Sequence, residues 1–497
     1  MTVMTASESR VRTYGGWRRS RGLGLMGLGS AQTLMVVIAL TVLILSVSVD
    51  LTLGGIVAGP ALLLIGGIVL RWDGVPLLHG ILQRIRWGWG STRGYTAYRA
   101  GVTAAHPHGW QLPGLLAPTT LLSVEDPGGE YGVVWHRRLG TMTVTLRVAA
   151  TSTWLVDPGQ AERWVANWGS WLAGLGYLPT VRWVAVTVDT APASGSRLAH
   201  YVAGRVAPHA PAAARRVLAQ LVEVSPAAAA DVETRVTITF DPALSPTRPR
   251  DLDESLAEVG RALPGLTDTL GSCGLTVLGR ATASDLLAVV RAAYDPAARG
   301  DVANALGDGA GLRRFLDWDT AGPIAANEFY DRYQHDSGWS VSWAWHEAPR
   351  ANVHADVLSR LLAPGGHPKR VTLLYRPASA ADASRIVDRE VNAASFRDAL
   401  RAAQKRDENA RDRADKERAM RAAREEAAGA GVGLMSMFVT VTVTDEDDLG
   451  RAVADAESRA EVAKIRLRRL RASQAAAFAV TLPCGICPPQ LATQWPR

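Results

Sequence analysis

The chain has 497 residues and a net charge of +7, from 54 Lys and Arg against 47 Asp and Glu. Its three cysteines exclude a fold built on a disulfide framework and indicate a reducing compartment. All of the excess positive charge precedes residue 100, so the rest of the chain lacks the basic balance expected of a nucleic-acid-binding protein. The sequence therefore argues against nucleic acid as a partner.

Residues 34–70 form an apolar stretch of 37 residues whose only charged side chain is Asp50. A bilayer core accommodates about 20 residues per helix, so this stretch is too long for one span. A charge held in hydrocarbon costs at least about 2.5 kcal/mol, which a turn at Asp50 avoids. The sequence predicts two membrane-spanning helices, roughly 25–49 and 51–70, joined at Asp50.

Arginines flank this hairpin on both sides. By the positive-inside rule, both ends of the chain are expected in the cytoplasm and the turn on the opposite side. We therefore expect a multi-pass protein of the inner (cytoplasmic) membrane, with a basic cytoplasmic tail at 1–24, a transmembrane hairpin at 25–71, and its bulk in the cytoplasm. The residues expected to set this topology are Arg18, Arg19, Arg21, Asp50, Arg71, Arg84 and Arg86.

Within the second span, Gly55 and Gly59 have a small-xxx-small spacing that allows close helix packing, and Pro60 is a candidate kink. The general enrichment of glycine in membrane helices is the alternative explanation.

Residues 72–110 form a basic and aromatic juxtamembrane segment that contains Trp87, Trp89, Tyr95 and Tyr98. Arginines beside aromatic rings are typical of the lipid headgroup layer. Stacking on single-stranded nucleic acid is the alternative, and the adjacent membrane hairpin favours the headgroup interpretation.

The rest of the chain alternates strand and helix patterns. This order predicts an α+β fold of cytoplasmic ferredoxin-like units, divided into subdomains at 111–300 and 301–497, the second with a long charged helix. Trp164, Trp168 and Trp171 fall on one helix face, which predicts core packing rather than sugar stacking. Strands are predicted at 131–136, 141–149, 181–189, 233–241, 275–280, 340–348, 370–377 and 433–445, and helices from Asp157, at 196–224, at 251–271 with a break near Pro264, at 282–294, at 353–362 and at 446–473.

Residues 379–428 are predicted to form one long helix or a helical hairpin with mixed charge. Asp407–Arg411, Asp412–Lys416 and Glu417–Arg421 are favourable pairs four residues apart. A solvated helix explains this pattern, and a partner-binding arm is the functional alternative. The candidate partner-binding residues are Arg411, Lys416 and Arg421.

No catalytic motif is found, so no catalytic residue, cofactor or metal site is predicted and the chain is not expected to be an enzyme. The stretch PGGHPKR at 364–370 lacks the spacing of a phosphate-binding loop. The ten histidines lack metal-ligand spacing. Cys484 and Cys487 form a C-x-x-C followed by two prolines, without the helix N-terminus that activates a thiolate, so both are expected to be replaceable by serine.

Four stretches of the chain together suggest a family. They are RTYGGWRRSRGLGLMGLG at 12–29, the twin spans, YRAG at 98–101 and QAAAFAVTLPCG at 474–485. With these the chain resembles a family of actinobacterial integral membrane proteins associated with conjugation-like secretion clusters. Its hairpin is similar to the PrgI-type membrane subunit of type IV secretion systems. Its soluble part resembles the N-terminal, non-ATPase domain of VirB-type secretion ATPases.

This resemblance implies a membrane-anchored scaffold of a type IV-like secretion or conjugation apparatus. Its expected partners are the membrane, a separate VirB-like secretion ATPase and other secretion-complex subunits, and a homo-oligomer is left open. One alternative is a type VII secretion membrane component with two N-terminal spans. The other is a membrane-anchored enzyme, which a ligand-sized polar pocket with perturbed titratable groups would support.

Overall fold

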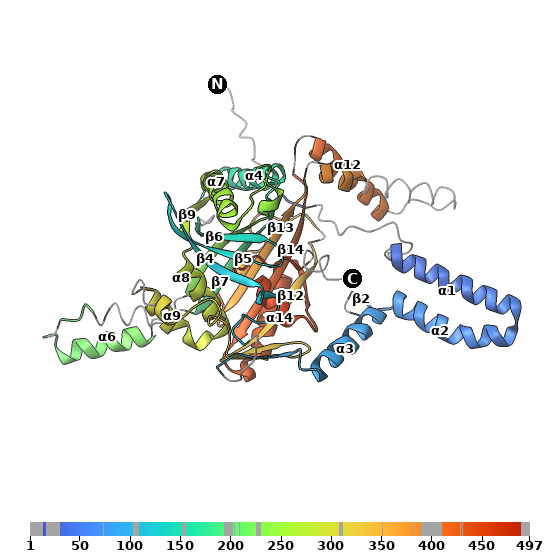
Figure 1. The fold of residues 1–497 in the computed structure, drawn as a ribbon, viewed down its shortest axis with the longest axis horizontal. Helices are drawn as coiled ribbons and strands as arrows, with labels where there is room; N and C mark the ends of the chain where they lie inside the picture. The colour runs from blue at the N-terminus through green and yellow to red at the C-terminus, as the bar shows by residue number, and fades with distance from the viewer. Residues whose placement is uncertain are drawn as a thin grey trace, which may run out of the picture. The chain divides into compact units, whose positions relative to one another are not determined.

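The computed structural model describes residues 13–15, 30–72, 74–102, 109–151, 156–192, 202, 204–207, 209–224, 230–307, 312–349, 351–379, 381–388, 410–427, 429 and 431–488 (Figure 1). The chain divides into two units. A sheet unit comprises Met1–Gly15, Ala97–Ala380 and Gly431–Arg497, and a helical unit comprises Gly16–Thr96 and Ala381–Ala430.

The helical unit begins with the predicted hairpin. Helix α1 spans Ser30–Val49 and α2 spans Leu51–Val69, and both are long and apolar enough to cross a membrane. Asp50 joins them as the N-cap of α2, accepting hydrogen bonds from Thr52 N at 3.1 Å and Thr52 Oγ1 at 2.5 Å. The cap satisfies a backbone donor that would otherwise be orphaned at the helix end. Asp50 therefore lies at the turn, as predicted.

The contact between α1 and α2 is made by a glycine other than the two predicted. Gly54 is buried, and a Cβ there would lie 2.6 Å from Val47 Cγ2. Ala61 and Ile68, each seven residues further along α2, are also buried. A Cβ at Gly55 or at Gly59 would meet nothing within 4 Å, so these two glycines do not mediate this packing. The spacing is right for close approach, but residues 55 and 59 lie on another face of the helix.

The other described elements of the helical unit are two short strands and further helical segments. Strands β1 (Arg71–Trp72) and β2 (Val75–Pro76) pair antiparallel and lead into α3 (Leu77–Thr92). Of the long charged helix predicted at 379–428, residues 381–388 and α12 (Ala410–Ala427) are helical, and 389–409 lie outside the described residues.

The described strands of the sheet unit form one 13-stranded sheet in which each registered pair is antiparallel. The spatial order is β3-β10-β11-β12-β14-β13-β7-β8-β6-β5-β4, with β15 beside β12 and β9 beside β6. The strands are β3 (Ala97–Arg99), β4 (Thr119–Asp126), β5 (Gly129–His136), β6 (Thr141–Ala150), β7 (Val181–Pro192), β8 (Ala230–Phe240), β9 (Leu275–Arg280), β10 (Ala325–Glu328), β11 (Tyr333–His335), β12 (Gly338–Glu347), β13 (Lys369–Pro377), β14 (Gly433–Val443) and β15 (Arg466–Arg469).

The sheet contains the same topology twice. The first repeat runs β6-α4-β7-α6-β8-α7-β9, where α6 is Ala212–Val224, and has the strand order β9-β6-β8-β7. The second runs β12-α10-β13-α12-β14-α13-β15 and has the order β15-β12-β14-β13. The repeats meet where β7 pairs with β13. Strands from the predicted segments 111–300 and 301–497 thus share one sheet, so the boundary at 300 does not coincide with a break in it.

Helices α4 (Pro158–Gly174) and α7 (Leu252–Leu270) cover one face of the first repeat (Figure 1). Trp171 of α4 is buried and donates its Nε1–H to Leu266 O at 3.2 Å, and Trp168 stacks on it, so the predicted tryptophan stripe packs in the core. The predicted break at Pro264 is wrong: the proline lies inside a continuous α7. The buried Leu263 and Leu266 beside it offset the one backbone hydrogen bond that proline removes.

The second repeat is covered on the same face by α10 (Ser359–Leu362) and α13 (Leu449–Val462). Both are shorter than the helices predicted at 353–362 and 446–473. Lys464, which has a positive φ of 57°, connects α13 to β15.

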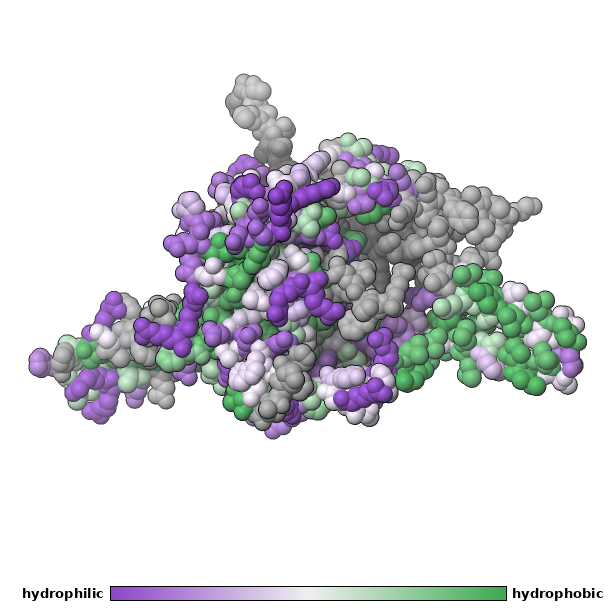
Figure 2. All heavy atoms as spheres, viewed as in Figure 1, coloured by the Kyte–Doolittle hydropathy of each residue, from purple (hydrophilic) through white to green (hydrophobic). Residues whose placement is uncertain are grey.

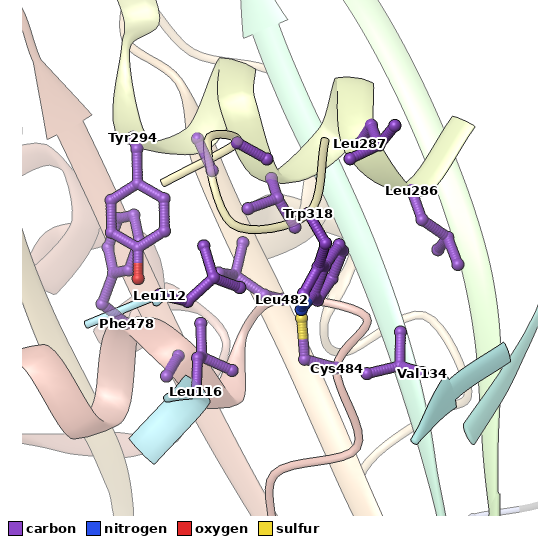
Figure 3. Close-up of a cluster of buried hydrophobic side chains, with 14 of the residues drawn as sticks. Leu112, Leu116, Val134, Leu286, Leu287, Tyr294, Trp318, Phe478, Leu482 and Cys484 are labelled. Atoms are coloured by element: carbon purple, nitrogen blue, oxygen red, sulfur yellow. The ribbon is translucent and has the colours of Figure 1, made fainter. Parts of the chain in front are cut away.

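The opposite face of the sheet carries α8 (Ala283–Tyr294), α9 (Arg299–Gly307) and α14 (Gln474–Val480), whose apolar side chains pack in the cluster in Figure 3. Helix α6 (Ala212–Val224) precedes β8.

Candidate functional site

The sheet face below α8 and α14 carries buried hydroxyl pairs. Each pair joins neighbouring strands, so two hydroxyl groups satisfy each other away from water. The Oγ–Oγ distances are 3.0 Å for Thr143–Thr239, 3.1 Å for Thr145–Thr237, 2.8 Å for Ser340–Thr442, 2.8 Å for Ser342–Thr440 and 2.9 Å for Thr187–Thr372.

These pairs occupy matching positions in the two repeats. The first strands carry Thr-Val-Thr at 143–145 and Ser-Val-Ser at 340–342, and the third strands carry VTITF at 236–240 and VTVTV at 439–443. Because side chains alternate between faces along a strand, the hydroxyl residues share one face and the valines and isoleucine share the other. The sequence thus contains a short internal repeat that the alternation of strands and helices did not reveal.

The C-terminal segment covers this face. Residues 481–487 are buried, and a Cβ at Gly485 would lie 2.0 Å from Thr143 Oγ1, so the backbone passes directly over the hydroxyl pairs. The hydroxyl of Thr481 accepts a hydrogen bond from Arg370 Nε at 3.1 Å. The guanidinium of Arg370 also lies over the ring of Phe478, 4.6 Å from its centroid. The C-terminal segment therefore fixes the position of Arg370.

Arg370 lines a pocket of about 460 Å³ on the same face. We call it the arginine pocket, because Arg235 of β8, Arg299 of α9 and Arg370 of β13 line it together with Asp189 of β7. The side chains of Arg235 and Asp189 are only 5% and 7% exposed, and Arg370 as a residue is 4% exposed. These three guanidinium groups and one carboxylate form the floor of the pocket.

Asp189 is shared between two of the three arginines. Its Oδ2 lies 3.1 Å from Arg235 Nη2, and its Oδ1 lies 3.9 Å from Arg299 Nη1. Arg235 Nη2 also contacts Glu233 Oε2 at 2.7 Å. Glu233 is 57% exposed, so this second pair lies towards the solvent.

Arg370 is different, because no carboxylate of the described residues lies within ion-pair distance of it. It stands directly opposite Asp189 in the register of β13 and β7, yet its Nη2 has no hydrogen-bond partner among the described residues. Asp189 Oδ1 also accepts no hydrogen bond there. Burial lowers the pKa of Arg370 to about 10, so its guanidinium is still charged at neutral pH.

One wall of the arginine pocket is apolar. It is formed by Val289 and Ala292 of α8 and by Val302 and Leu306 of α9. Arg147, Asp231 and Asp285 complete the charged lining. Asp285 is already engaged, since it closes the capping box of α8 with Thr282 and pairs with Arg147 at 3.4 Å. The pocket therefore combines a positively charged floor with an apolar side.

A second buried polar group lies further along the same face. His335 of β11 is fully buried, and its Nδ1 lies 2.6 Å from Tyr294 O while its Nε2 lies 2.8 Å from Ser340 Oγ. Since a carbonyl only accepts, Nδ1 carries the proton and Nε2 accepts from the serine. Burial lowers the pKa of His335 to about 4, so this imidazole is neutral at pH 7.

The topology residues predicted from the sequence are only partly within the described residues. Arg18, Arg19 and Arg21 lie outside them. Asp50 caps α2 at the turn, and Arg71 is exposed where α2 has ended, so these two charges lie at opposite ends of that helix. Arg84 and Arg86 are exposed on α3.

The three predicted partner-binding residues, Arg411, Lys416 and Arg421, all lie on α12. The side chain of Arg421 is exposed. The side chains of Arg411 and Lys416 lie outside the described residues, so the structure does not place them relative to Arg421.

The C-x-x-C cysteines lie in the core. Cys484 is buried beside Trp318, Leu482 and Val134 (Figure 3), and burial raises the pKa of its thiol. Cys487 is buried next to Trp183 and Leu374. Neither cysteine forms a disulfide bond within the part of the chain that the structure describes. Their expected replacement by serine would therefore introduce hydroxyl groups into apolar surroundings.

Within the described ranges, no group of three or more His, Cys, Asp and Glu side chains is arranged to hold a metal ion. No protein-family model matches the chain, and no curated protein matches its sequence. The arginine pocket escaped the sequence analysis because its charges come from strands far apart in the chain. The signal that could have revealed it was the run of charges Asp231, Glu233 and Arg235, which is in phase with Thr237 and Thr239 on one strand face.

Proposed function

We propose that the chain is a membrane-anchored scaffold of a type IV-like secretion or conjugation apparatus that docks a separate ATPase. The hairpin anchors it in the cytoplasmic membrane as a multi-pass protein, and the sheet unit and α12 face the cytoplasm. The observation that carries the proposal is the apolar hairpin with its charges confined to the ends of α2.

Several features of the hairpin support the anchor. At 1.5 Å per residue, the 20 and 19 residues of α1 and α2 span about 30 Å and about 28 Å, close to the thickness of a bilayer core. Side chains such as Ile44, Ile56 and Leu63 are 67%, 76% and 79% exposed. Figure 2 shows apolar residues covering the hairpin. In water these exposed apolar side chains would be unfavourably hydrated, whereas the lipid core of a bilayer removes that free-energy cost.

The repeated topology supports the likeness to a secretion-ATPase N-terminal domain. We assign each repeat to a ferredoxin-like β-α-β-β-α-β unit with one helix inserted between its second and third strands, because its strands stand in the order fourth, first, third, second and its other two helices lie on one face. The alternation of strand and helix patterns predicts such units, and the resemblance implies a domain like the one that precedes the motor in VirB-type secretion ATPases. The doubled arrangement therefore favours a domain that positions other proteins.

Helix α12 supplies the docking surface of this proposal. It has basic and acidic residues interspersed along its length, and its apolar residues are alanines and the single Met420. Such a surface selects partners by charge complementarity more than by burial. Arg411, Lys416 and Arg421 are the residues we assign to contact with the motor.

The test uses the full chain in nanodiscs and the ATPase encoded beside its gene. We expect stable co-purification, lost on reversing Arg411, Lys416 and Arg421 to Glu. A matched control reverses Arg261, Arg313 and Arg451, which are exposed arginines of the sheet unit. ATP turnover by the chain alone would reject the scaffold. Equal binding by the two triple variants would reject α12 as the docking surface.

A membrane-anchored enzyme is the second candidate, and the arginine pocket favours it. The pocket is of ligand size and holds buried charges, including a guanidinium whose pKa is lowered. Its charged lining consists of arginines and carboxylates. Arginines suit the binding and positioning of anions, whereas proton transfer requires a group that titrates near neutral pH. The pocket thus supports ligand binding more directly than catalysis.

A further inference from the structure

The floor of the arginine pocket has an excess of buried positive charge. Arg235 and Arg299 share Asp189, and Arg235 has Glu233 as a second partner, whereas Arg370 has none of the described carboxylates within ion-pair distance. Buried charges in proteins are ordinarily paired, because removing an ion from water costs several kcal/mol after relaxation. An anion in the pocket would supply the missing charge.

We propose that the arginine pocket binds a small organic anion with an oxyanion head, a hydrogen-bond donor beside it, and an apolar body. The oxyanion is a carboxylate or phosphoryl group that accepts from Arg370 Nη2. The adjacent donor is a hydroxyl or ammonium group that donates to Asp189 Oδ1. This inference is independent of the secretion role.

Two buried atoms that have no hydrogen-bond partner among the described residues define the head of the ligand. Arg370 Nη2 is a donor and Asp189 Oδ1 an acceptor, and both belong to pocket-lining residues that face each other across β13 and β7. Leaving either group unsatisfied and buried is costly. A ligand that offers an acceptor and a donor side by side satisfies both at once.

The position of Arg370 is set before any ligand binds. Its Nε is engaged by Thr481, and its guanidinium plane lies over Phe478. These contacts hold the fork in one orientation and leave Nη2 unused. A preoriented donor reduces the ordering cost of binding. The C-terminal segment is therefore part of this site as well as a cover for the sheet.

The remaining volume suits an apolar body of modest size. The pocket holds about 460 Å³, within the range of ordinary small-molecule sites. Val289, Ala292 and Leu306 present a wall of short aliphatic groups. A compact aromatic or branched aliphatic group fits this wall, whereas a highly polar body would be desolvated there without partners.

The test measures binding to the full-length protein in nanodiscs by calorimetry and by ligand-induced change in Tm. Four probes separate the chemical groups. Mandelate has the carboxylate, the hydroxyl and a phenyl body; phenylglycine replaces the hydroxyl with an ammonium group; phenylacetate lacks the donor; and 2-phenylethanol lacks the carboxylate. We expect mandelate or phenylglycine to bind at least about tenfold more tightly than phenylacetate, and 2-phenylethanol not to bind.

Arg370→Met removes the charged donor and is compared with Arg451→Met, whose side chain is 81% exposed outside the pocket. We expect Arg370→Met to abolish the ligand-induced rise in Tm and Arg451→Met to retain it. A purely structural Arg370 would instead lower the Tm of the ligand-free protein and leave binding unchanged. That result would overturn the proposal.

Ala292→Trp fills the pocket without altering a charged residue, so it tests the site even where Arg370→Met fails to fold. We expect it to abolish binding of mandelate and phenylglycine. Retained binding would place the ligand elsewhere and contradict the proposal. Failure of all four probes to bind the unaltered protein would also contradict it, and would leave ordered water as the partner of Arg370 and Asp189.

Discussion

Thr187 of β7 and Thr372 of β13 face each other at the junction of the two repeats, with their hydroxyl oxygens 2.9 Å apart. Both are buried. The remaining hydroxyl pairs lie on either side of them, between the first and third strands of each repeat. The junction is also held by the backbone pairing of β7 with β13 and by Tyr375 of β13, which packs in the core of the first repeat.

Replacing both members of this pair should lower the free energy of unfolding by less than the sum of the two single replacements. Thr187→Val or Thr372→Val alone leaves one buried hydroxyl unsatisfied, at a cost of about 1–3 kcal/mol. The double variant pairs two valines of similar shape and should lose less than the sum of the single losses. A double-mutant cycle on the free energy of unfolding measures this coupling. Simple additivity would show that the hydroxyl contact contributes nothing to the junction.

His335 should make the protein less stable as the pH falls. Its folded pKa is about 4, below the ordinary value of 6.5, so the unfolded chain takes up a proton first. His335 makes its full contribution to the free energy of unfolding above about pH 6.5, and this contribution falls by on the order of 3 kcal/mol as the pH drops towards 4. Because glutamine does not titrate, the unfolding free energy of His335→Gln should differ less between pH 7 and pH 4.5 than that of the unaltered protein. Identical pH profiles for both proteins would contradict a buried neutral imidazole.

Cys484 should tolerate alanine better than serine. Its sulfur lies among Trp318, Leu482 and Val134, where a thiol behaves as a small apolar group (Figure 3). Cys484→Ser buries a hydroxyl and should lower stability by about 1–3 kcal/mol, beyond the loss for Cys484→Ala. Thermal unfolding of the two variants checks this order. A serine variant as stable as the alanine variant would contradict an apolar environment for the sulfur of Cys484.

The packing of the hairpin should depend on Gly54 and not on Gly55. A Cβ at position 54 would lie 2.6 Å from Val47 Cγ2, whereas the same atom at position 55 has open space. Gly54→Leu should therefore separate α1 from α2 and lower the Tm in nanodiscs, and Gly55→Leu is the matched control. Equal effects of the two substitutions would show that the hairpin packs through a different face.

The sequence predicted the elements whose signals are local. The span boundaries at Asp50 and the strand at 275–280 match the structure, because charge placement and period-two alternation identify them directly. It missed β15, since the stretch Arg-Leu-Arg-Arg at 466–469 resembles the charged end of the preceding helix. It also missed the edge strand β3 and its neighbour β10, which are three and four residues long and too short to show a period-two pattern.

The arginine pocket could not be predicted in the same way. Asp189, Arg235 and Arg370 come together only through the pairing of β7 with β8 and of β7 with β13. That pairing depends on the meeting of two repeats, and the repeats share only short patterns such as VTITF and VTVTV. Long-range sheet order, rather than local propensity, determines this site.

The membrane topology tests the account most directly, because a scaffold for a cytoplasmic ATPase must have its sheet unit on the cytoplasmic side. Reporter fusions after Asp50 and after Arg497, in intact cells, report the side of the membrane on which each position lies. The account predicts opposite sides, with Arg497 in the cytoplasm and Asp50 outside, as the arginines flanking the hairpin require. A report that Arg497 lies outside, or on the same side as Asp50, would contradict both the hairpin anchor and the docking of an ATPase.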